Sequence, residues 1–143
     1  GGPASNSVLN DLLRERNDWV YGVEASYTQY SESGILAISL GCDRSNLEKC
    51  LKETFKAIGR LQDTPLSERK LKAAKKQLLG QLAISSDNGE TQCLSMGKSL
   101  LSFGTVFSDG ENVAAIENVS AEQLRSIACE ILAPERMSSL IYL

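Results

Sequence analysis

A stretch near the start of the chain, residues 9–30, changes from a helical pattern of apolar side chains to a strand pattern with no proline between them. Apolar residues recur at helical spacing up to Leu13, which predicts a helix with one apolar face. From Trp19 the pattern alternates and predicts a strand that runs to about residue 30. Tyr21 then shares a face with Val23. The end of a helix must therefore lie directly beside the start of a strand.

The rest of the chain predicts one hairpin partner for this strand and then mainly helices. Residues 31–34 form a predicted hairpin loop and residues 35–42 a second, antiparallel strand. Capping and periodicity predict further helices that start after Ser45, Ser67, the break at residues 87–89, Ser108 and Ser120, and a final strand over residues 137–143. Ser45 with Glu48, and Ser120 with Gln123, have the spacing of capping boxes. The predicted class is α+β, an antiparallel or mixed sheet with helices packed on one face.

Length and charge restrict the classes of function. A chain of 143 residues predicts one domain. A net charge of −3 does not favour a nucleic-acid partner. The sequence has no apolar run of membrane-spanning length and no signal-like start, so we expect no membrane partner. The expectation is a soluble protein, cytoplasmic or periplasmic if bacterial, whose compartment is otherwise unknown.

The chain contains no histidine, which excludes most hydrolytic centres. Serine, cysteine and metal hydrolases nearly all use an imidazole as a base or a ligand. A His-x-x-Glu-His zinc motif cannot be present. The four cysteines contain no Cys-x-x-Cys pair and are interpreted as reduced core residues. We therefore expect no catalytic residue, metal or cofactor in this chain.

Arg14 and Tyr21 are the candidate binding residues. Arg14 lies nearly opposite the apolar stripe of the first helix, so its guanidinium can stay exposed. A guanidinium donates several hydrogen bonds and a phenol can donate or accept one, so the pair can orient a peptide carbonyl or stabilise an oxyanion. Two alternatives stay open from spacing alone. Arg14 can pair with a nearby Asp11, Glu15 or Asp18, and Tyr21 can be a core residue.

The same stretch resembles a known family. Seven residues match its pattern Ser-x-Leu-x-x-x-Leu-Arg-Glu-x-x-x-x-x-Tyr-x-Val: Ser7, Leu9, Leu13, Arg14, Glu15, Tyr21 and Val23. The pattern is that of the helix-to-strand segment in the non-zinc half of the pitrilysin/insulinase-type zinc peptidases, which include the mitochondrial processing peptidases. Asp18 stands where the family often has glycine. The resemblance continues more weakly through residues 71–75 and 119–131.

The resemblance implies a metal-free, substrate-binding C-terminal domain, spanning residues 1–143, of a larger peptidase. Family domains usually have strands before the first helix, so we expect a fragment. Arg14 and Tyr21 would reach toward a peptide bound at a zinc carried by a partner domain, in the same or another chain. Two alternatives are an inactive structural subunit of the same family and a free-standing α+β domain that binds a small ligand.

Overall fold

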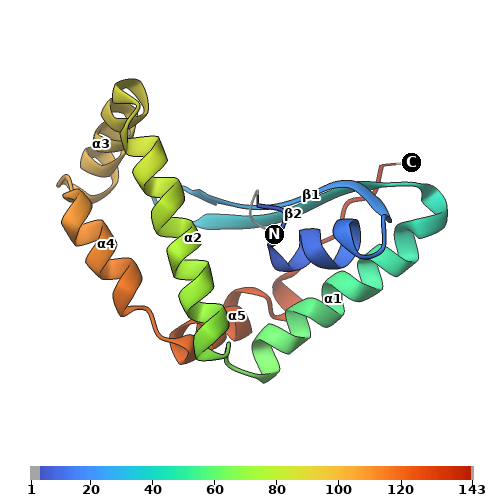
Figure 1. Cartoon of the computed structure of the whole chain (residues 1–143). Helices are drawn as coiled ribbons and strands as arrows, with labels where there is room; N and C mark the ends of the chain where they lie inside the picture. The colour runs from blue at the N-terminus through green and yellow to red at the C-terminus, as the bar shows by residue number, and fades with distance from the viewer. Residues whose placement is uncertain (1–3, 143) are drawn as a thin grey trace. The chain divides into compact units, whose positions relative to one another are not determined.

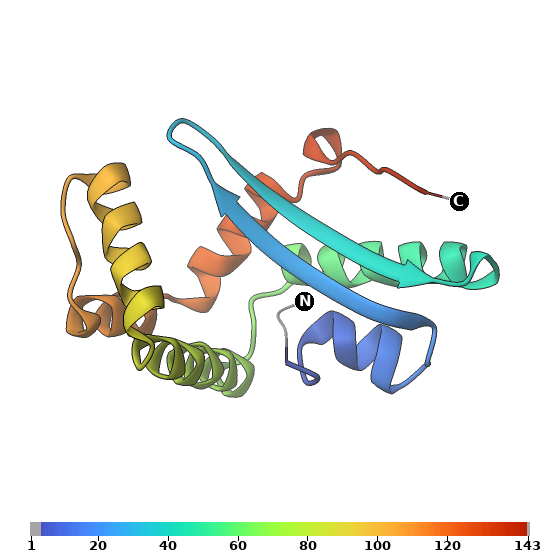
Figure 2. The same cartoon turned by 90° about the horizontal axis from the view of Figure 1, so that it is seen from above.

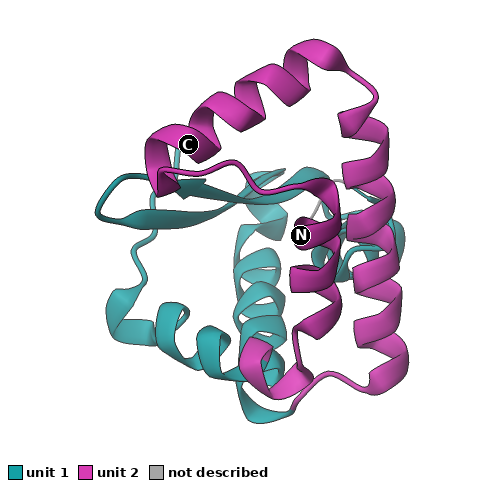
Figure 3. Cartoon of the chain, turned by 90° about the vertical axis from the view of Figure 1, so that its left-hand side faces the viewer, with its two compact units in different colours: residues 1–64, 125–143 teal, residues 65–124 magenta. Residues whose placement is uncertain are grey.

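A computed structural model describes residues 4–142 of the chain. These residues are mostly helical, with a two-stranded antiparallel sheet, which confirms the α+β class (Figure 1). The chain divides into two compact units (Figure 3): a first unit of residues 1–64 and 125–143, and a second unit of residues 65–124. The prediction of a single domain over residues 1–143 stays a prediction.

The first unit is built on a hairpin with helices beside it. A π-helix, η1 (Asn10–Glu15), precedes strands β1 (Val20–Gln29) and β2 (Gly34–Cys42). A short turn, η2 (Arg44–Asn46), leads into helix α1 (Leu47–Asp63), and η3 (Pro134–Arg136) follows the end of α5 (Ala121–Ile131). Seen from above, η1 flanks β1 on the side away from β2, and α1 runs behind the hairpin (Figure 2). The predicted helix, hairpin and following helix are confirmed.

The core of the first unit joins η1, β1 and α1. Leu13 and Cys50 are completely buried, with 0% of their surface exposed. They form one cluster with Val20 and Val23 of β1, and Trp19 packs against it from the turn before the strand. The apolar stripe at the start of the chain therefore lies against the strand that follows it. This packing holds the end of η1 beside the start of β1.

Strand β1 begins with a β-bulge at Tyr21. Val20 is opposite Cys42 and Gly22 is opposite Gly41, so Tyr21 is an extra residue without a partner on β2. The bulge turns Val20 to the same buried side as Val23 and leaves Tyr21 exposed. The prediction that Tyr21 shares the apolar face of Val23 was wrong, because the bulge shifts the alternation by one residue.

The second unit consists of helices α2 (Glu68–Ser86), α3 (Gly89–Phe103), α4 (Asp109–Asn118) and the start of α5. Its helix ends have clear local signals. Ser108 forms a full capping box with Glu111, and Gly104 ends α3 in a left-handed conformation with φ 71°. The Lys75 ammonium donates to the Glu117 carbonyl oxygen at 2.7 Å and joins α2 to α4. No residue of this unit is buried, although all of its residues are described.

Three local predictions were wrong and one capping box was confirmed. The Ser45 capping box does not form, because η2 occupies that position and Asn46, which caps α1, makes no side-chain bond. Residues 137–142 form no strand and Leu143 lies outside the described residues; a strand needs a neighbour, and the described sheet contains only β1 and β2. Of the cysteines, only Cys50 is buried. The capping box of Ser120 and Gln123 forms completely: the backbone N–H of each residue donates to the side-chain oxygen of the other.

Candidate functional site

A buried asparagine of η1, Asn10, forms a hydrogen bond to the backbone of β1. Asn10 has 6% of its surface exposed, and its amide donates to the Ser7 hydroxyl at 3.0 Å and to the Val23 carbonyl at 3.4 Å. A buried amide with such partners is costly to displace. The contact sets the face of η1 that carries Arg14, four residues later, against the first half of β1.

The turn between η1 and β1 is tight. The Asp18 N–H donates to the Arg14 carbonyl at 2.9 Å, and the Trp19 N–H donates to the Leu13 carbonyl at 3.0 Å. Asp18 has φ 51°, in the left-handed region that glycine adopts without strain and that aspartate tolerates better than most residues. Asp18 therefore forms this tight turn in a backbone conformation that glycine adopts without strain.

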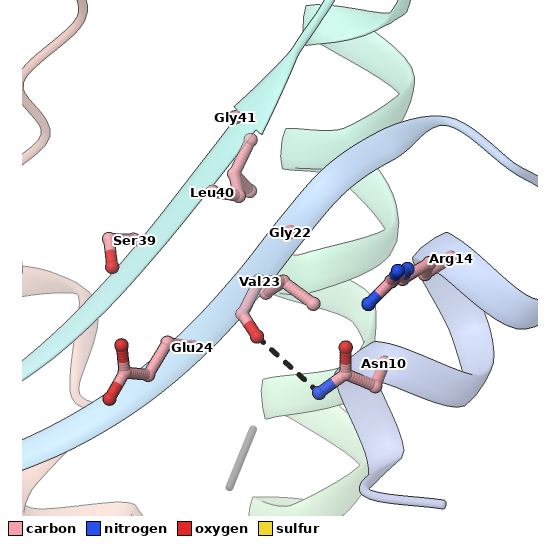
Figure 4. Close-up of a pocket in the computed structure, with 8 residues that line it drawn as sticks. All are labelled: Asn10, Arg14, Gly22, Val23, Glu24, Ser39, Leu40 and Gly41. Carbon is pink, nitrogen blue, oxygen red and sulfur yellow. Dashed lines mark hydrogen bonds between the residues drawn. The ribbon is translucent and has the colours of Figure 1, made fainter. Parts of the chain in front are cut away.

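An open hollow lies between η1 and the start of the hairpin. Its volume is about 480 Å³; η1 contributes Asn10 and Arg14, β1 contributes residues 22–24, and β2 contributes residues 39–41. Figure 4 shows the Arg14 guanidinium extending from η1 toward β1. The glycines at positions 22 and 41 contribute only backbone to the lining. Glu24 adds a carboxylate, so the hollow offers charges of both signs and exposed peptide groups.

Arg14 is exposed and available to a ligand. Its guanidinium makes no hydrogen bond or ion pair within residues 4–142, because Asp11 pairs instead with Arg16 at 2.5 Å. The alternative in which Arg14 pairs with a neighbouring carboxylate is therefore wrong for the described residues. An unpaired guanidinium at the wall of a hollow can bind a carbonyl or carboxylate oxygen of a ligand.

Tyr21 lies beside Gly41, one of the residues that line the hollow. Its side chain is 71% exposed, so the alternative of a core tyrosine is wrong. Tyr21 Cδ2 lies 3.9 Å from the position that a Cβ on Gly41 would take, which places the ring against a residue of the lining. That Arg14 and Tyr21 act side by side stays a prediction.

Sequence reasoning missed Asp43. The Tyr21 hydroxyl donates to Asp43 Oδ1 at 2.7 Å. This hydrogen bond, together with the negative charge of Asp43, raises the pKa of Tyr21 above its usual value, because ionisation would remove the donated proton. The two residues are 22 positions apart and meet where β1 carries its bulge. The isolated glycine at position 22, inside the alternating pattern, is a sequence signal that could have indicated the bulge.

Between residues 4 and 142, no three His, Cys, Asp or Glu side chains are grouped so that they could hold a metal ion. With no histidine in the sequence, the chain cannot carry a His-x-x-Glu-His zinc motif. None of the helices within residues 4–142 combines the length and apolar character needed to cross a membrane.

Sequence comparison identifies related proteins. Residues 1–78, more than half of the chain, match the family described as the peptidase M16 inactive domain. A protein of Bacillus subtilis named as an uncharacterized zinc protease, YmxG, is 23% identical over 141 residues, which are 99% of this chain and 34% of that protein. An uncharacterized zinc protease of Rickettsia felis is 25% identical over 140 residues, 98% of this chain and 34% of its own length. The chain thus spans about a third of these relatives.

Two solved structures share the fold. A chain of complex III2 from Candida albicans, with Inz-5 bound, superposes with a TM-score of 0.76 at 19% identity, over 91% of this chain and 31% of that chain. The periplasmic protease PqqL of Escherichia coli superposes with a TM-score of 0.64 at 15% identity, over 85% of this chain and 14% of PqqL. At such identities the likeness concerns the arrangement of helices and strands.

Proposed function

Because the chain belongs to the family of the peptidase M16 inactive domain, we propose that it is the substrate-binding domain of a longer zinc-dependent endopeptidase that acts on peptides or unfolded chains. A non-catalytic role follows from the family and agrees with a sequence that has no histidine. The zinc belongs to a partner domain, in the same or another chain. The relatives named as zinc proteases are about three times as long as this chain, which is long enough to include a second domain of this kind.

The observation that carries this proposal is the Arg14 guanidinium at the wall of the hollow, which has no hydrogen-bond or ion-pair partner within residues 4–142. It extends toward β1, and Gly22 of β1 and Gly41 of β2 leave the backbone open to an extended peptide (Figure 4). The planar set of N–H donors on a guanidinium can hydrogen-bond a peptide carbonyl, and these hydrogen bonds become stronger when the carbonyl oxygen acquires negative charge. Tyr21, whose exposed ring lies against Gly41, would supply a second polar contact. The pair would hold the backbone of the substrate for chemistry that takes place on the partner domain.

The test uses the full-length protein that contains this domain together with its zinc-bearing partner. We expect Arg14→Ala to lower kcat/KM for an internally quenched peptide by about 10- to 100-fold, since hydrogen bonds to charged groups contribute about 1.5–3 kcal/mol. Tyr21→Phe should lower it by about 3- to 10-fold. Zinc content, measured by atomic absorption, and thermal unfolding should not change.

Arg16→Ala is the matched control. Arg16 is an exposed arginine two positions away whose partner is Asp11, and an exposed ion pair contributes little. We expect wild-type turnover from this variant. Wild-type turnover in both Arg14→Ala and Tyr21→Phe would contradict the proposal and favour the alternative, a structural subunit. That alternative also predicts a partner region without an intact His-x-x-Glu-His motif.

A further inference from the structure

The Asp43 carboxylate is directed at Tyr21 by the backbone around it. Asp43 follows the last residue of β2 and has an extended conformation, with φ −63° and ψ 148°. Its carbonyl accepts the Asn46 N–H at 2.9 Å, which fixes its backbone at the start of η2. Its side chain makes no capping bond to η2 and instead accepts the Tyr21 hydroxyl at 2.7 Å. Within residues 4–142 the carboxylate has no other hydrogen bond or ion pair.

The bulge and Asp43 together determine where the Tyr21 hydroxyl lies. The bulge turns the tyrosine outward, and the ring rests against Gly41, which lines the hollow. A phenol carries one proton, and Tyr21 donates that proton to Asp43. Only the lone pairs of Oη then remain for a ligand. A carboxylate so close also disfavours a second negative charge at the same place.

We propose that Asp43 is a positioning residue for Tyr21: it takes the hydroxyl proton and leaves Oη to accept a backbone N–H of the bound peptide. This inference rests on the proposed function and assigns a different hydrogen-bonding role to each of the two binding residues. Arg14, which can only donate, binds a carbonyl of the peptide. Tyr21, held as an acceptor, binds an amide N–H. An extended peptide presents both kinds of group along its backbone, so the two residues would recognise main chain rather than a particular side chain.

The test again uses the full-length protein with its zinc-bearing partner and an internally quenched peptide. Asp43→Ala frees the hydroxyl to rotate and should raise KM by roughly fivefold with little change in kcat, as expected when binding alone is lost. Asp43→Asn keeps an oxygen that can accept the hydroxyl, and its KM should lie close to the wild-type value. Asp63→Ala, which removes an exposed carboxylate at the far end of α1, is the control and should leave KM unchanged.

Two further measurements separate positioning from a general structural effect. The double variant Tyr21→Phe/Asp43→Ala should have the same KM as Tyr21→Phe, because Asp43 acts only through the hydroxyl. A series of probe peptides, each with one backbone nitrogen methylated, should contain one position at which methylation raises KM of the wild type but not of Tyr21→Phe. Methylation removes the N–H that Oη accepts.

The outcomes distinguish this inference from the proposed function. If Arg14→Ala and Tyr21→Phe lower turnover but Asp43→Ala does not raise KM, the role of Asp43 is wrong and the proposed function stands. The inference is also overturned if Asp43→Asn is as impaired as Asp43→Ala, or if no methylated position depends on Tyr21. If neither Arg14→Ala nor Tyr21→Phe has an effect, the proposed function fails, and the role of Asp43 fails with it.

Discussion

The two units of this chain both consist mostly of regular structure but differ in how they bury apolar side chains. In the first unit, η1, β1 and α1 enclose Leu13 and Cys50 completely. In the second unit, α2, α3 and α4 contact one another, yet no residue is buried and Leu101 is 89% exposed. Regular helices therefore do not by themselves provide a buried core in this protein, because a core needs apolar surfaces that face one another.

The candidate site lies on the unit that has a core. Arg14 follows Leu13 directly in sequence, and Tyr21 lies between the buried Val20 and Val23. Side chains that bind a ligand need a backbone that does not move when they do so, and packing of neighbouring residues supplies it. The helices of the second unit are held mainly by caps and by a few contacts such as that of Lys75 with Glu117. We expect the two units to respond differently to the same kind of substitution.

The largest difference should come from leucine truncation. Leu13→Ala removes a side chain with 0% exposure and should lower the free energy of unfolding by about 3 kcal/mol, because a cavity remains in the core. Leu101→Ala removes a side chain that is 89% exposed and should change it by no more than about 0.5 kcal/mol. Urea denaturation followed by circular dichroism measures both values. Equal losses would show that the second unit has a core of its own.

Thiol reactivity should divide the cysteines in the same way. Cys50 is completely buried, and burial raises its pKa to about 11, so little thiolate exists near neutral pH. At about pH 8 we expect it to react with a disulfide reagent roughly a hundredfold more slowly than an ordinary exposed thiol. Cys93 in the second unit and Cys129 are exposed and should react first.

The control for this experiment is the unfolded chain. In concentrated urea all four thiols should react at similar rates, because burial then no longer protects Cys50. Mass spectrometry of partly modified protein identifies which cysteines have reacted. Early modification of Cys50 in the folded protein would contradict the buried core described for the first unit.

The smallest effect should come from a helix cap in the second unit. Ser108→Ala removes the capping box of α4 and should lower the free energy of unfolding by about 1 kcal/mol, measured by urea denaturation. Ser67→Ala is the matched control, because Ser67 precedes α2 without a side-chain capping bond. This substitution should lower the free energy of unfolding by less than Ser108→Ala does. A loss at Ser67 as large as that at Ser108 would contradict the assigned cap.

The same cap has a pH dependence with a definite sign. Hydrogen bonds donated by the Ser108 backbone N–H and hydroxyl lower the pKa of Glu111 in the folded protein. A carboxyl group with a lowered folded pKa contributes stability above its unfolded pKa and loses it as the pH falls through the folded value. The difference in stability between the wild type and Glu111→Gln should therefore shrink on acidification.

Local signals predicted most of the secondary structure. The apolar stripe ending at Leu13, the alternation after Trp19 and the box at Ser120 each depend on residues within a few positions of one another. One failure is local, because η2 occupies the place of the expected Ser45 capping box. The other failures concern longer distances. The bulge at Tyr21 depends on how β1 pairs with β2, and the strand expected over residues 137–142 would need a neighbouring strand. Burial also depends on which elements pack together, so the apolar positions of the four cysteines could not predict that Cys50 alone among them is buried.

The sequence by itself determined that this chain is α+β, has no histidine chemistry and carries Arg14 and Tyr21 seven residues apart across a helix-to-strand turn. Only the tertiary structure decided that Arg14 lies at the wall of a hollow with no partner among the described residues 4–142, and that the Tyr21 hydroxyl meets Asp43. The physical reason is the sequence distance over which each kind of interaction acts. Periodicity and capping act along one segment, whereas a bulge and a hydrogen bond between residues 22 positions apart arise only when two strands pair.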